Sequence, residues 1–179
     1  MEIKKSFLPV NLYSRPGRKL NSVKGIVIHW VANPKTTADQ NRNYFEGLKN
    51  QKTDDKRYAG AHFIIGLEGE IIQCIPEDEI GYHVGANSYK QEAVNRLSVY
   101  PNNCTIGIEL CHLNWDGEFS ALTLDAAKNL ILDLCQRYSL GRGDIYRHFD
   151  ITGKDCPRYF VQHENEWVKF LDFVFSQYH

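Results

Sequence analysis

The chain has 179 residues, and we expect residues 1–179 to form a single domain that folds without disulfide bonds. Hydrophobic residues make up 42% of the sequence and charged residues 24%, a composition that excludes wholesale disorder. The formal net charge of -1 gives no electrostatic reason to expect a nucleic-acid-binding protein. No apolar run approaches the roughly 18 residues of a membrane-spanning helix.

The N-terminal segment contains Pro9, Pro16 and Gly17, and residues 1–22 are expected to form an irregular arm. This segment has positive residues but no apolar stretch of signal-peptide length, so we expect synthesis in the cytoplasm. The five cysteines are irregularly spaced and include no CxxC pair, which argues against a disulfide framework. Most of them are expected to be small buried hydrophobic residues.

The first regular elements are a strand and a helix. Residues 25–31 (GIVIHWV) form a nearly continuous apolar run, typical of a strand buried on both faces, and Pro34 ends it. Thr36 or Thr37 can cap a helix that runs to about residue 48. The inner face of this helix is expected to consist of Tyr44, Phe45 and Leu48.

A hairpin and a further strand occupy the middle of the chain. Residues 61–65 and 71–75 predict two strands joined by a turn at 67–70. The polar residues 50–57 before them are expected to be an exposed loop. Residues 88–103 are expected to be an insertion or surface loop, and the apolar segment after it predicts a fourth strand at 105–111.

The last third of the chain predicts mainly helices. Apolar residues recur at helical spacing from Leu124 to Tyr138, in a helix that Thr123 can cap and Gly141 can end. A short extended piece at 145–149 carries His148. A final helix follows, with an apolar face made of Trp167, Phe170, Leu171, Val174 and Tyr178. This order of elements predicts an α/β or α+β layer fold with helices at the edges of a sheet. Of the two we expect α/β, with a central mixed β-sheet flanked by helices.

Two histidines and a cysteine are candidates for a metal site. His29 lies inside the first apolar run, where a structural core histidine is the ordinary interpretation. The segment RHFDITGKDCPR places His148 and Cys156 eight residues apart. Imidazole nitrogen and thiolate are zinc ligands, and three protein ligands with an open fourth position are typical of catalytic zinc. The H-x7-C spacing is not that of a standard zinc finger, so a flexible loop with an incidental thiol stays open.

Two charged residues are candidates for catalysis. Glu109 lies in the apolar segment TIGIELC, on the same strand face as Gly107 and Cys111. A buried carboxylate is costly unless it is paired, so both a structural ion pair and a general base beside a metal stay open. Lys154 lies two residues before Cys156. Most lysines are solvated surface charges, but near a metal this ammonium can stabilise an oxyanion.

Six segments of the chain together resemble the zinc-dependent N-acetylmuramoyl-L-alanine amidases of the type-2 amidase and peptidoglycan-recognition-protein superfamily. The nearest likeness is to the catalytic domains of phage endolysins and bacterial autolysins. The resemblance extends from about Phe7 to about Trp167. It rests on SRPGRKL, IVIHW, AHFIIGLEGEIIQCIP, GYHVGAN, CTIGIEL and RHFDITGKDCP, in this order.

The resemblance implies hydrolysis of the amide bond between N-acetylmuramic acid and L-alanine in bacterial peptidoglycan, which lyses the cell wall. It implies one Zn²⁺ per chain, with the ligands His29, His148 and Cys156. It also implies that Glu109 is the catalytic acid and base and that Lys154 stabilises the transition state. His62 and His83 fall at groove positions associated with the substrate.

One position departs from the family pattern. Many relatives carry an aromatic residue before the histidine of the HF strand, and some use a tyrosine hydroxyl there. This chain has Ala61, so no catalytic tyrosine is assigned and Glu109 is expected to carry more of the proton transfer. Arg158 is a further candidate, since it can reach a substrate carboxylate, although a solvated arginine is about equally expected.

The remaining histidines and tryptophans are given mainly structural roles. His112 is expected on the strand face opposite Glu109, and His163 and His179 at the surface. We expect Trp30 and Trp167 in the core. Trp115 lies in the polar turn LNWDGE and is expected to be exposed at the rim of the groove.

Three other functions stay open. The first is a peptidoglycan-binding module without activity, although such members typically lack the zinc cysteine. The second is a cysteine hydrolase with Cys156 as nucleophile and His148 as base, which leaves His29 and Glu109 without a role. The third is a regulatory interaction protein, for which the sequence offers no argument.

The expected partner is peptidoglycan, without nucleic acid or membrane insertion, and the expected state is a monomer. Because peptidoglycan lies outside the membrane, a chain made in the cytoplasm must be released to reach it. We expect holin-type release of a phage endolysin or cell lysis in the case of an autolysin. Many endolysins continue into a separate wall-binding domain, so both a short complete enzyme and a catalytic fragment stay open.

Overall fold

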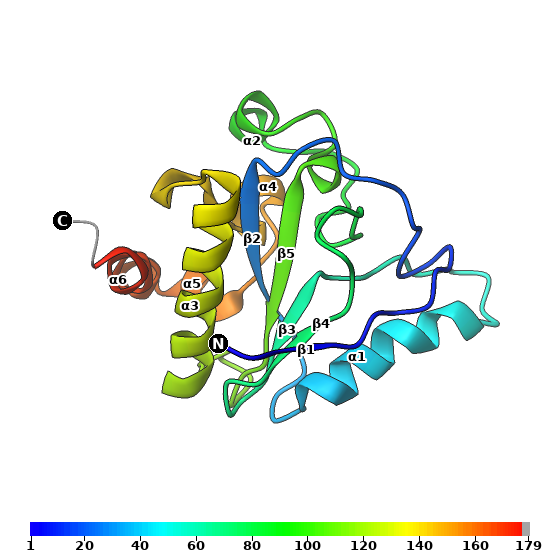
Figure 1. Ribbon diagram of the computed structural model, residues 1–179, viewed down its shortest axis with the longest axis horizontal. Coiled ribbons are helices and arrows are strands. Elements are labelled where there is room, and N and C mark those ends of the chain that lie inside the picture. The colour runs from blue at the N-terminus through cyan, green and yellow to red at the C-terminus, as the bar shows by residue number, and fades with distance from the viewer. Residues whose placement is uncertain (177–179) are drawn as a thin grey trace.

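Six strands form one mixed β-sheet in the computed structural model, which describes residues 1–176 (Figure 1). Their order across the sheet is β1-β4-β3-β5-β2-β6, and every neighbouring pair is parallel except β3 and β4. The strands are β1 (Ile3–Lys5), β2 (Gly25–Trp30), β3 (Phe63–Ile65), β4 (Ile71–Gln73), β5 (Thr105–Leu110) and β6 (Ile145–Arg147).

The helices surround this sheet, so the predicted fold class, a mixed sheet flanked by helices, is confirmed. They are α1 (Ala38–Gly47), α2 (Gln91–Arg96), α3 (Ala121–Tyr138), α4 (His148–Thr152), α5 (Arg158–Gln162) and α6 (Glu164–Phe175). Three short 3-10 turns, Leu48–Asn50, Pro101–Asn103 and Arg142–Asp144, complete the regular structure. Among the described residues, no helix combines the length and apolar character that crossing a membrane requires.

One face of the sheet carries the main hydrophobic core. Successive side chains of a strand point to opposite faces. On β2, Ile26 and Ile28 therefore share a face, and they pack in one cluster with Leu130 of α3 and Phe170 of α6. Figure 1 shows α3 and α6 together on this side of the sheet and α1 on the other side.

The opposite face is covered in two separate patches. Near α1, Phe45 packs with Ile64 and Ile72 of the central hairpin. Near α2 and α4, Val27 packs with other apolar side chains. Neither cluster includes His29 or Glu109, which the register of β2 and β5 places directly beside each other. This face therefore leaves a polar strip between two apolar patches.

The structure corrects two of the predicted loops. Residues 3–5 of the expected irregular arm form β1, which pairs with β4 at the edge of the sheet, since β4 offers free backbone groups there. Residues 88–103 contain α2 and the turn Pro101–Asn103. The buried side chains of Ala93 and Leu97 hold this segment against the protein, an anchoring that its polar composition did not reveal.

The helix boundaries also differ in detail. Thr37, one of the two predicted caps, caps α1, but Ser120 rather than Thr123 caps α3. The helix α3 ends at Ser139, in the left-handed conformation, before Gly141 is reached. On α1, Phe45 is buried as predicted, whereas the Tyr44 side chain is 48% exposed. The predicted Tyr178 of the final helix lies outside the described residues.

His62 connects β5 to a neighbouring loop. Its imidazole Nδ1 accepts a hydrogen bond from the Gly107 amide at 3.0 Å, and its Nε2 donates to the Glu79 carbonyl at 2.8 Å. The residue is 0% exposed. Both ring nitrogens are engaged by backbone, so the expectation that His62 contacts the substrate is wrong and its role is structural.

Replacing Thr37 with alanine should destabilise the protein by about 1 kcal/mol. The Thr37 hydroxyl accepts from the Gln40 amide, while the Gln40 side chain accepts from the Thr37 amide, a reciprocal capping box. Urea unfolding of both proteins measures the difference. Thr37→Ser keeps the oxygen and should unfold near the wild-type midpoint, so equal losses in both variants would contradict the capping role.

His62 should make stability dependent on pH. Burial lowers the pKa of His62 from 6.5 to about 4. At a pH between these two values, the unfolded chain therefore binds a proton at this imidazole that the folded chain does not bind. The stability that this residue contributes is therefore complete above pH 6.5 and is lost as the pH falls to about 4. The full effect is about 3 kcal/mol.

His62→Gln removes the titration while keeping a side-chain donor. Urea unfolding of the two proteins from pH 7.5 to pH 4 should show a shallower loss of stability in the variant. Parallel curves would contradict this assignment.

Candidate active site

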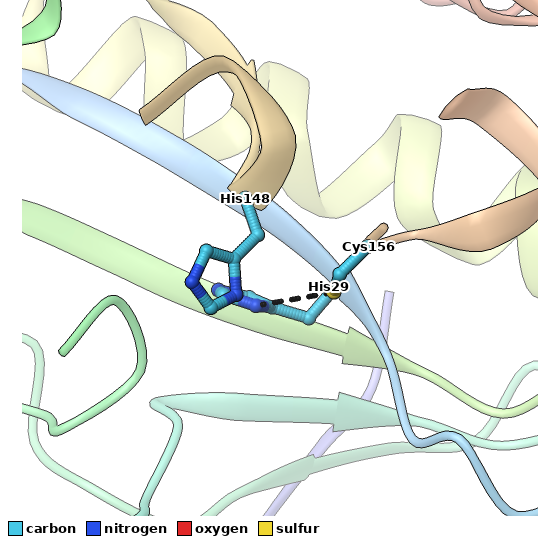
Figure 2. Close-up of side chains that lie close together, drawn as sticks. All are labelled: His29, His148 and Cys156. Atoms are coloured by element: carbon cyan, nitrogen blue, oxygen red, sulfur yellow. Dashed lines mark hydrogen bonds between the residues drawn. The ribbon is translucent and has the colours of Figure 1, made fainter. Parts of the chain in front are cut away.

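Three buried donors from distant parts of the sequence meet at one end of the sheet. His29 lies on β2, His148 is the first residue of α4, directly after β6, and Cys156 lies between α4 and α5. Because β6 pairs with β2, the chain delivers His148 beside His29. One ligand atom from each residue lies within 4.8 Å of those of the other two. Figure 2 shows these side chains pointing toward one another.

A chain of hydrogen bonds fixes the tautomer of His29. The Thr105 hydroxyl donates to the Pro101 carbonyl, so His83 Nε2 must be the donor toward Thr105, at 3.2–3.3 Å. The Nδ1 of the neutral His83 ring is then an acceptor, and His29 Nε2 donates to it at 3.1 Å. This arrangement leaves the lone pair of His29 Nδ1 directed at Cys156 Sγ, 3.7 Å away.

Gly107 makes room for His83 on the sheet. A Cβ atom at position 107 would lie 2.5 Å from His83 Cγ, closer than atoms tolerate. Asn102 holds the other side of His83, accepting hydrogen bonds from the His83 and Val84 amides. His83 is therefore buried beneath the site as a support for His29, and the expectation that it contacts the substrate is wrong.

The three donors fit a zinc ion. Burial lowers the pKa of His29 well below its usual value and that of His148 to about 4, so both rings are neutral, the form that binds metal. The buried Nδ1 of His148 has no hydrogen-bond partner among the described residues. A support that orients one ligand and an unpartnered nitrogen on another are features of a metal centre. The donor set of two imidazoles and one thiol is one that zinc accepts.

Glu109 lies next to this centre. It is opposite His29 in the parallel pairing of β2 and β5, so the two side chains share a sheet face. Burial raises the pKa of Glu109 to about 8, against the opposing effect of the Lys154 charge. Its Oε2 atom has no hydrogen-bond partner among residues 1–176. Among the described residues, no ion pair therefore accounts for this half-buried carboxylate.

A pocket of about 370 Å³ opens beside Glu109. Lys154, which is exposed, lies on its wall together with Trp30. Further lining comes from α1 and the following loop, with Tyr44, Arg57 and Tyr58. A substrate can therefore reach Glu109 and Lys154 at the same time, beside the buried donors.

The part of the pocket wall that residues 44–58 contribute was not expected from the sequence. Residues 50–57 were expected to be an exposed loop, and all of them except the half-buried Gln51 are exposed, but Arg57 also lines the pocket. No motif marks this arginine. Only the fold brings the end of this loop to the pocket that Lys154 also lines.

Arg158 and Trp115 lie together outside this pocket. The Arg158 guanidinium stacks over Trp30 at 4.8 Å and donates to the Asp155 carboxylate and to the Trp115 carbonyl. Arg158 is thus engaged by the protein, and a substrate contact for it stays a prediction. Trp115 is 63% exposed, as expected.

The other aromatic residues and histidines also have defined places. Trp30 and Trp167 are buried, as expected, and His163 is exposed. His112 is buried against the Trp30 ring, with ring centroids 4.6 Å apart, and is structural. His179 lies outside the described residues.

Comparison with curated proteins gives close relatives. A probable N-acetylmuramoyl-L-alanine amidase of Bacillus licheniformis is 39% identical over 92% of this chain. The amidase BlyA of Bacillus subtilis is 36% identical over 94%. The chain spans less than half of these relatives, 45% and 46% of their lengths.

Solved structures show the same architecture. A mutant endolysin from Bacillus subtilis is 26% identical, with a TM-score of 0.72, over 97% of this chain and 98% of that one. The E. coli amidase AmiD shares the fold at 22% identity and a TM-score of 0.60, over 83% of this chain and 57% of that one. Its structure was solved with anhydro-N-acetylmuramic acid-L-Ala-D-γ-Glu-L-Lys.

A family model described as N-acetylmuramoyl-L-alanine amidase matches residues 19–159. This range contains every donor of the buried centre, together with Glu109 and the pocket beside it. The resemblance read from the sequence motifs and the arrangement of the fold agree with this match. The chain therefore belongs to the N-acetylmuramoyl-L-alanine amidase family.

Proposed function

We propose that this chain hydrolyses the amide bond between N-acetylmuramic acid and L-alanine in peptidoglycan, with one zinc ion held by His29, His148 and Cys156. The observation that carries the proposal is the meeting of these three buried donors beside an unpaired carboxylate, Glu109, at the wall of a pocket. The family match and the curated amidases at 36–39% identity support it.

The chain prepares its donors for the metal. His83 holds the His29 ring so that Nδ1 faces Cys156. Zinc in this centre would supply a Lewis acid, which polarises an amide carbonyl and lowers the pKa of a water molecule toward about 7. A thiolate ligand moderates the positive charge of the centre, compared with three neutral imidazoles.

Glu109 would move the proton. Its unpartnered Oε2 can accept a proton from the attacking water and then donate it to the leaving amine of L-alanine. Amines are poor leaving groups unless they are protonated, so the second transfer is what allows the amide bond to break. Since Ala61 offers no hydroxyl, Glu109 is the group assigned to both transfers.

Lys154 would stabilise the charge that develops during attack. When water adds to the amide, negative charge accumulates on the former carbonyl oxygen, and a fixed ammonium group nearby lowers the energy of this state. Lys154 lines the same pocket as Glu109 and its charge acts on that carboxyl group. It is thus placed to act on a substrate bound there.

A thiol-nucleophile mechanism is less compatible with this geometry. Cys156 is 3% exposed, and its sulfur lies 3.7 Å from His29 Nδ1, whereas the alternative assigns His148 as its base. That mechanism also gives Glu109 no role.

The proposed site of action is the cell wall, reached after release from the cytoplasm, and the proposed working state is a monomer. The likeness to an endolysin of Bacillus subtilis at 26% identity supports the first of these.

Cys156→Ser should abolish both zinc binding and wall lysis, because a serine hydroxyl is a poor zinc ligand. Zinc content by elemental analysis should fall from about one ion per chain in the wild type to near zero. Cys104→Ser is the matched control, since Cys104 is buried outside the site and a serine can keep its contact with the Pro101 carbonyl.

Three outcomes of this comparison are decisive. New amino termini on the digested wall would accompany the expected amidase activity. Wild-type lysis that persists in strong chelator without bound metal would contradict the zinc mechanism. Bound zinc without hydrolysis by the wild type would instead indicate a peptidoglycan-binding module.

Glu109→Gln should lower kcat by at least about 100-fold, because the amide cannot transfer the proton. Zinc content and substrate affinity should change little, since Glu109 is not one of the three donors. Steady-state kinetics on a soluble muropeptide measures the loss. Glu68→Gln, a change at an exposed turn residue, should keep wild-type rates, and a Glu109 variant of near-wild-type kcat would refute the assignment.

A further inference from the structure

The pocket beside Glu109 carries an uncompensated positive charge. Two cations, Arg57 and Lys154, line it, and Glu109 is the one acidic residue in its lining within the described part of the chain. Neither cation forms an ion pair with any of residues 1–176, whereas the neighbouring Arg158 is paired with Asp155. An anionic group of a bound substrate would therefore find unpaired cations in this pocket.

The two cations come from different parts of the fold: Lys154 lies two residues before the donor Cys156, and Arg57 lies at the end of the loop that follows α1. The charge of Lys154 acts on Glu109, His29 and His148, while that of Arg57 affects none of them appreciably. Lys154 is thus engaged at the site of hydrolysis. Arg57 lines the same pocket from the loop after α1, so it can bind a part of the substrate beyond the scissile amide.

The backbone of Arg57 is held in place although its loop is exposed. The Gln51 side-chain oxygen accepts a hydrogen bond from the Arg57 amide at 2.8 Å, and the Gln51 amide group donates to the Arg57 carbonyl at 2.9 Å. The same amide group donates to the Leu48 carbonyl at 2.8 Å. One side chain thus ties both backbone groups of Arg57 to the turn that ends α1.

Packing on the next residue adds a second restraint. The Tyr58 ring contacts Tyr13 and Tyr82, with ring centroids 5.4 and 5.9 Å apart. The backbone of Arg57 and of the residue after it is therefore held in place before any ligand binds. A cation on an anchored backbone loses less conformational entropy on binding than one on a mobile loop, which favours selective binding.

The substrate has one suitable anion close to the scissile bond. In the stem peptide bound to AmiD, L-Ala is followed by D-γ-Glu and L-Lys. A glutamate linked through its γ-carboxyl keeps its α-carboxyl free, one residue beyond L-Ala. The muramic acid side of the scissile bond carries no charge once its lactyl carboxyl is in the amide. Arg57, the second cation of this pocket, therefore matches the peptide side of the scissile bond.

Resting on the proposed function, we propose that Arg57 is a specificity-determining residue that binds the free α-carboxylate of the γ-linked glutamate, and that Gln51 is its positioning residue. The guanidinium can bind a carboxylate through two parallel N–H groups. Amidation of that carboxyl, which gives isoglutamine, removes the charge and one acceptor. The enzyme then prefers stem peptides in which the glutamate is not amidated.

The test compares two soluble muropeptides that differ only at this carboxyl group, one with γ-linked glutamate and one with isoglutamine. For the zinc-loaded wild type, kcat/KM should be at least about tenfold higher on the acid, mainly through a lower KM. Arg57→Gln should reduce this ratio to near one by raising KM for the acid, with little change for the amide. Arg57→Lys should restore part of the preference, since it keeps the charge without the planar fork.

Two further variants separate binding from general loop effects. Lys52→Gln removes a charge from the same exposed loop at a residue that does not line the pocket, and it should keep the wild-type ratio. Gln51→Ala keeps the Arg57 charge but releases its backbone, so the ratio should fall, mainly through a higher KM for the acid. A loss of folding alone would lower the rate on both muropeptides equally.

A second readout keeps this inference distinct from the proposed function. Calorimetric binding of both muropeptides to the Glu109→Gln variant reads the preference without turnover. The inference is supported if this variant binds the acid more tightly than the amide and the difference disappears when Arg57→Gln is added. This result would stand even if the wild type hydrolyses neither compound and the proposed function fails. Equal kcat/KM of the wild type on acid and amide, or a preference unchanged in Arg57→Gln, would overturn it.

Discussion

The parallel pairing of β2 with β5 is the constraint on which the rest of the site depends. Its register sets His29 beside Glu109 on one face of the sheet. The pairing of β6 on the other side of β2 then brings His148 to the same end. The backbone hydrogen bonds of three strands thus position groups that lie as far apart in sequence as residues 29 and 148, and the two helical layers keep that arrangement in place.

This positioning requires polar groups to be buried, which costs free energy unless they are hydrogen-bonded. The protein offsets much of that cost, since His62 and His83 have partners at both ring nitrogens. Among the described residues, partners are missing at Glu109 Oε2, His148 Nδ1 and His112 Nε2. The first two atoms lie where a metal, water or substrate would bind, so part of the stability of the folded protein is expected to come from its ligands.

Much of the fold, and the chemistry of the buried centre, could be predicted from the sequence. The apolar runs gave the central strands, and the motifs around His29, Glu109 and Cys156 pointed to one family. The edge strand β1 and the helix α2 could not be found, because their short polar segments are held by partners distant in sequence. For the same reason the motifs did not predict that His62 and His83 are buried supports of the site. They also did not predict that Arg57 lines the pocket.

Residues of the core and of the site alternate along β2, and this limits which changes of sequence the protein can tolerate. Ile26 and Ile28 serve the hydrophobic core, while Val27 and His29 face the other side. Inserting or deleting one residue within the strand would exchange the two sets, so core and site would fail together. Length changes in the exposed loop before Arg57 would leave this alternation intact. Evolution can therefore remodel the wall of the pocket by changing loop length, but it can alter the central strands only by substitution.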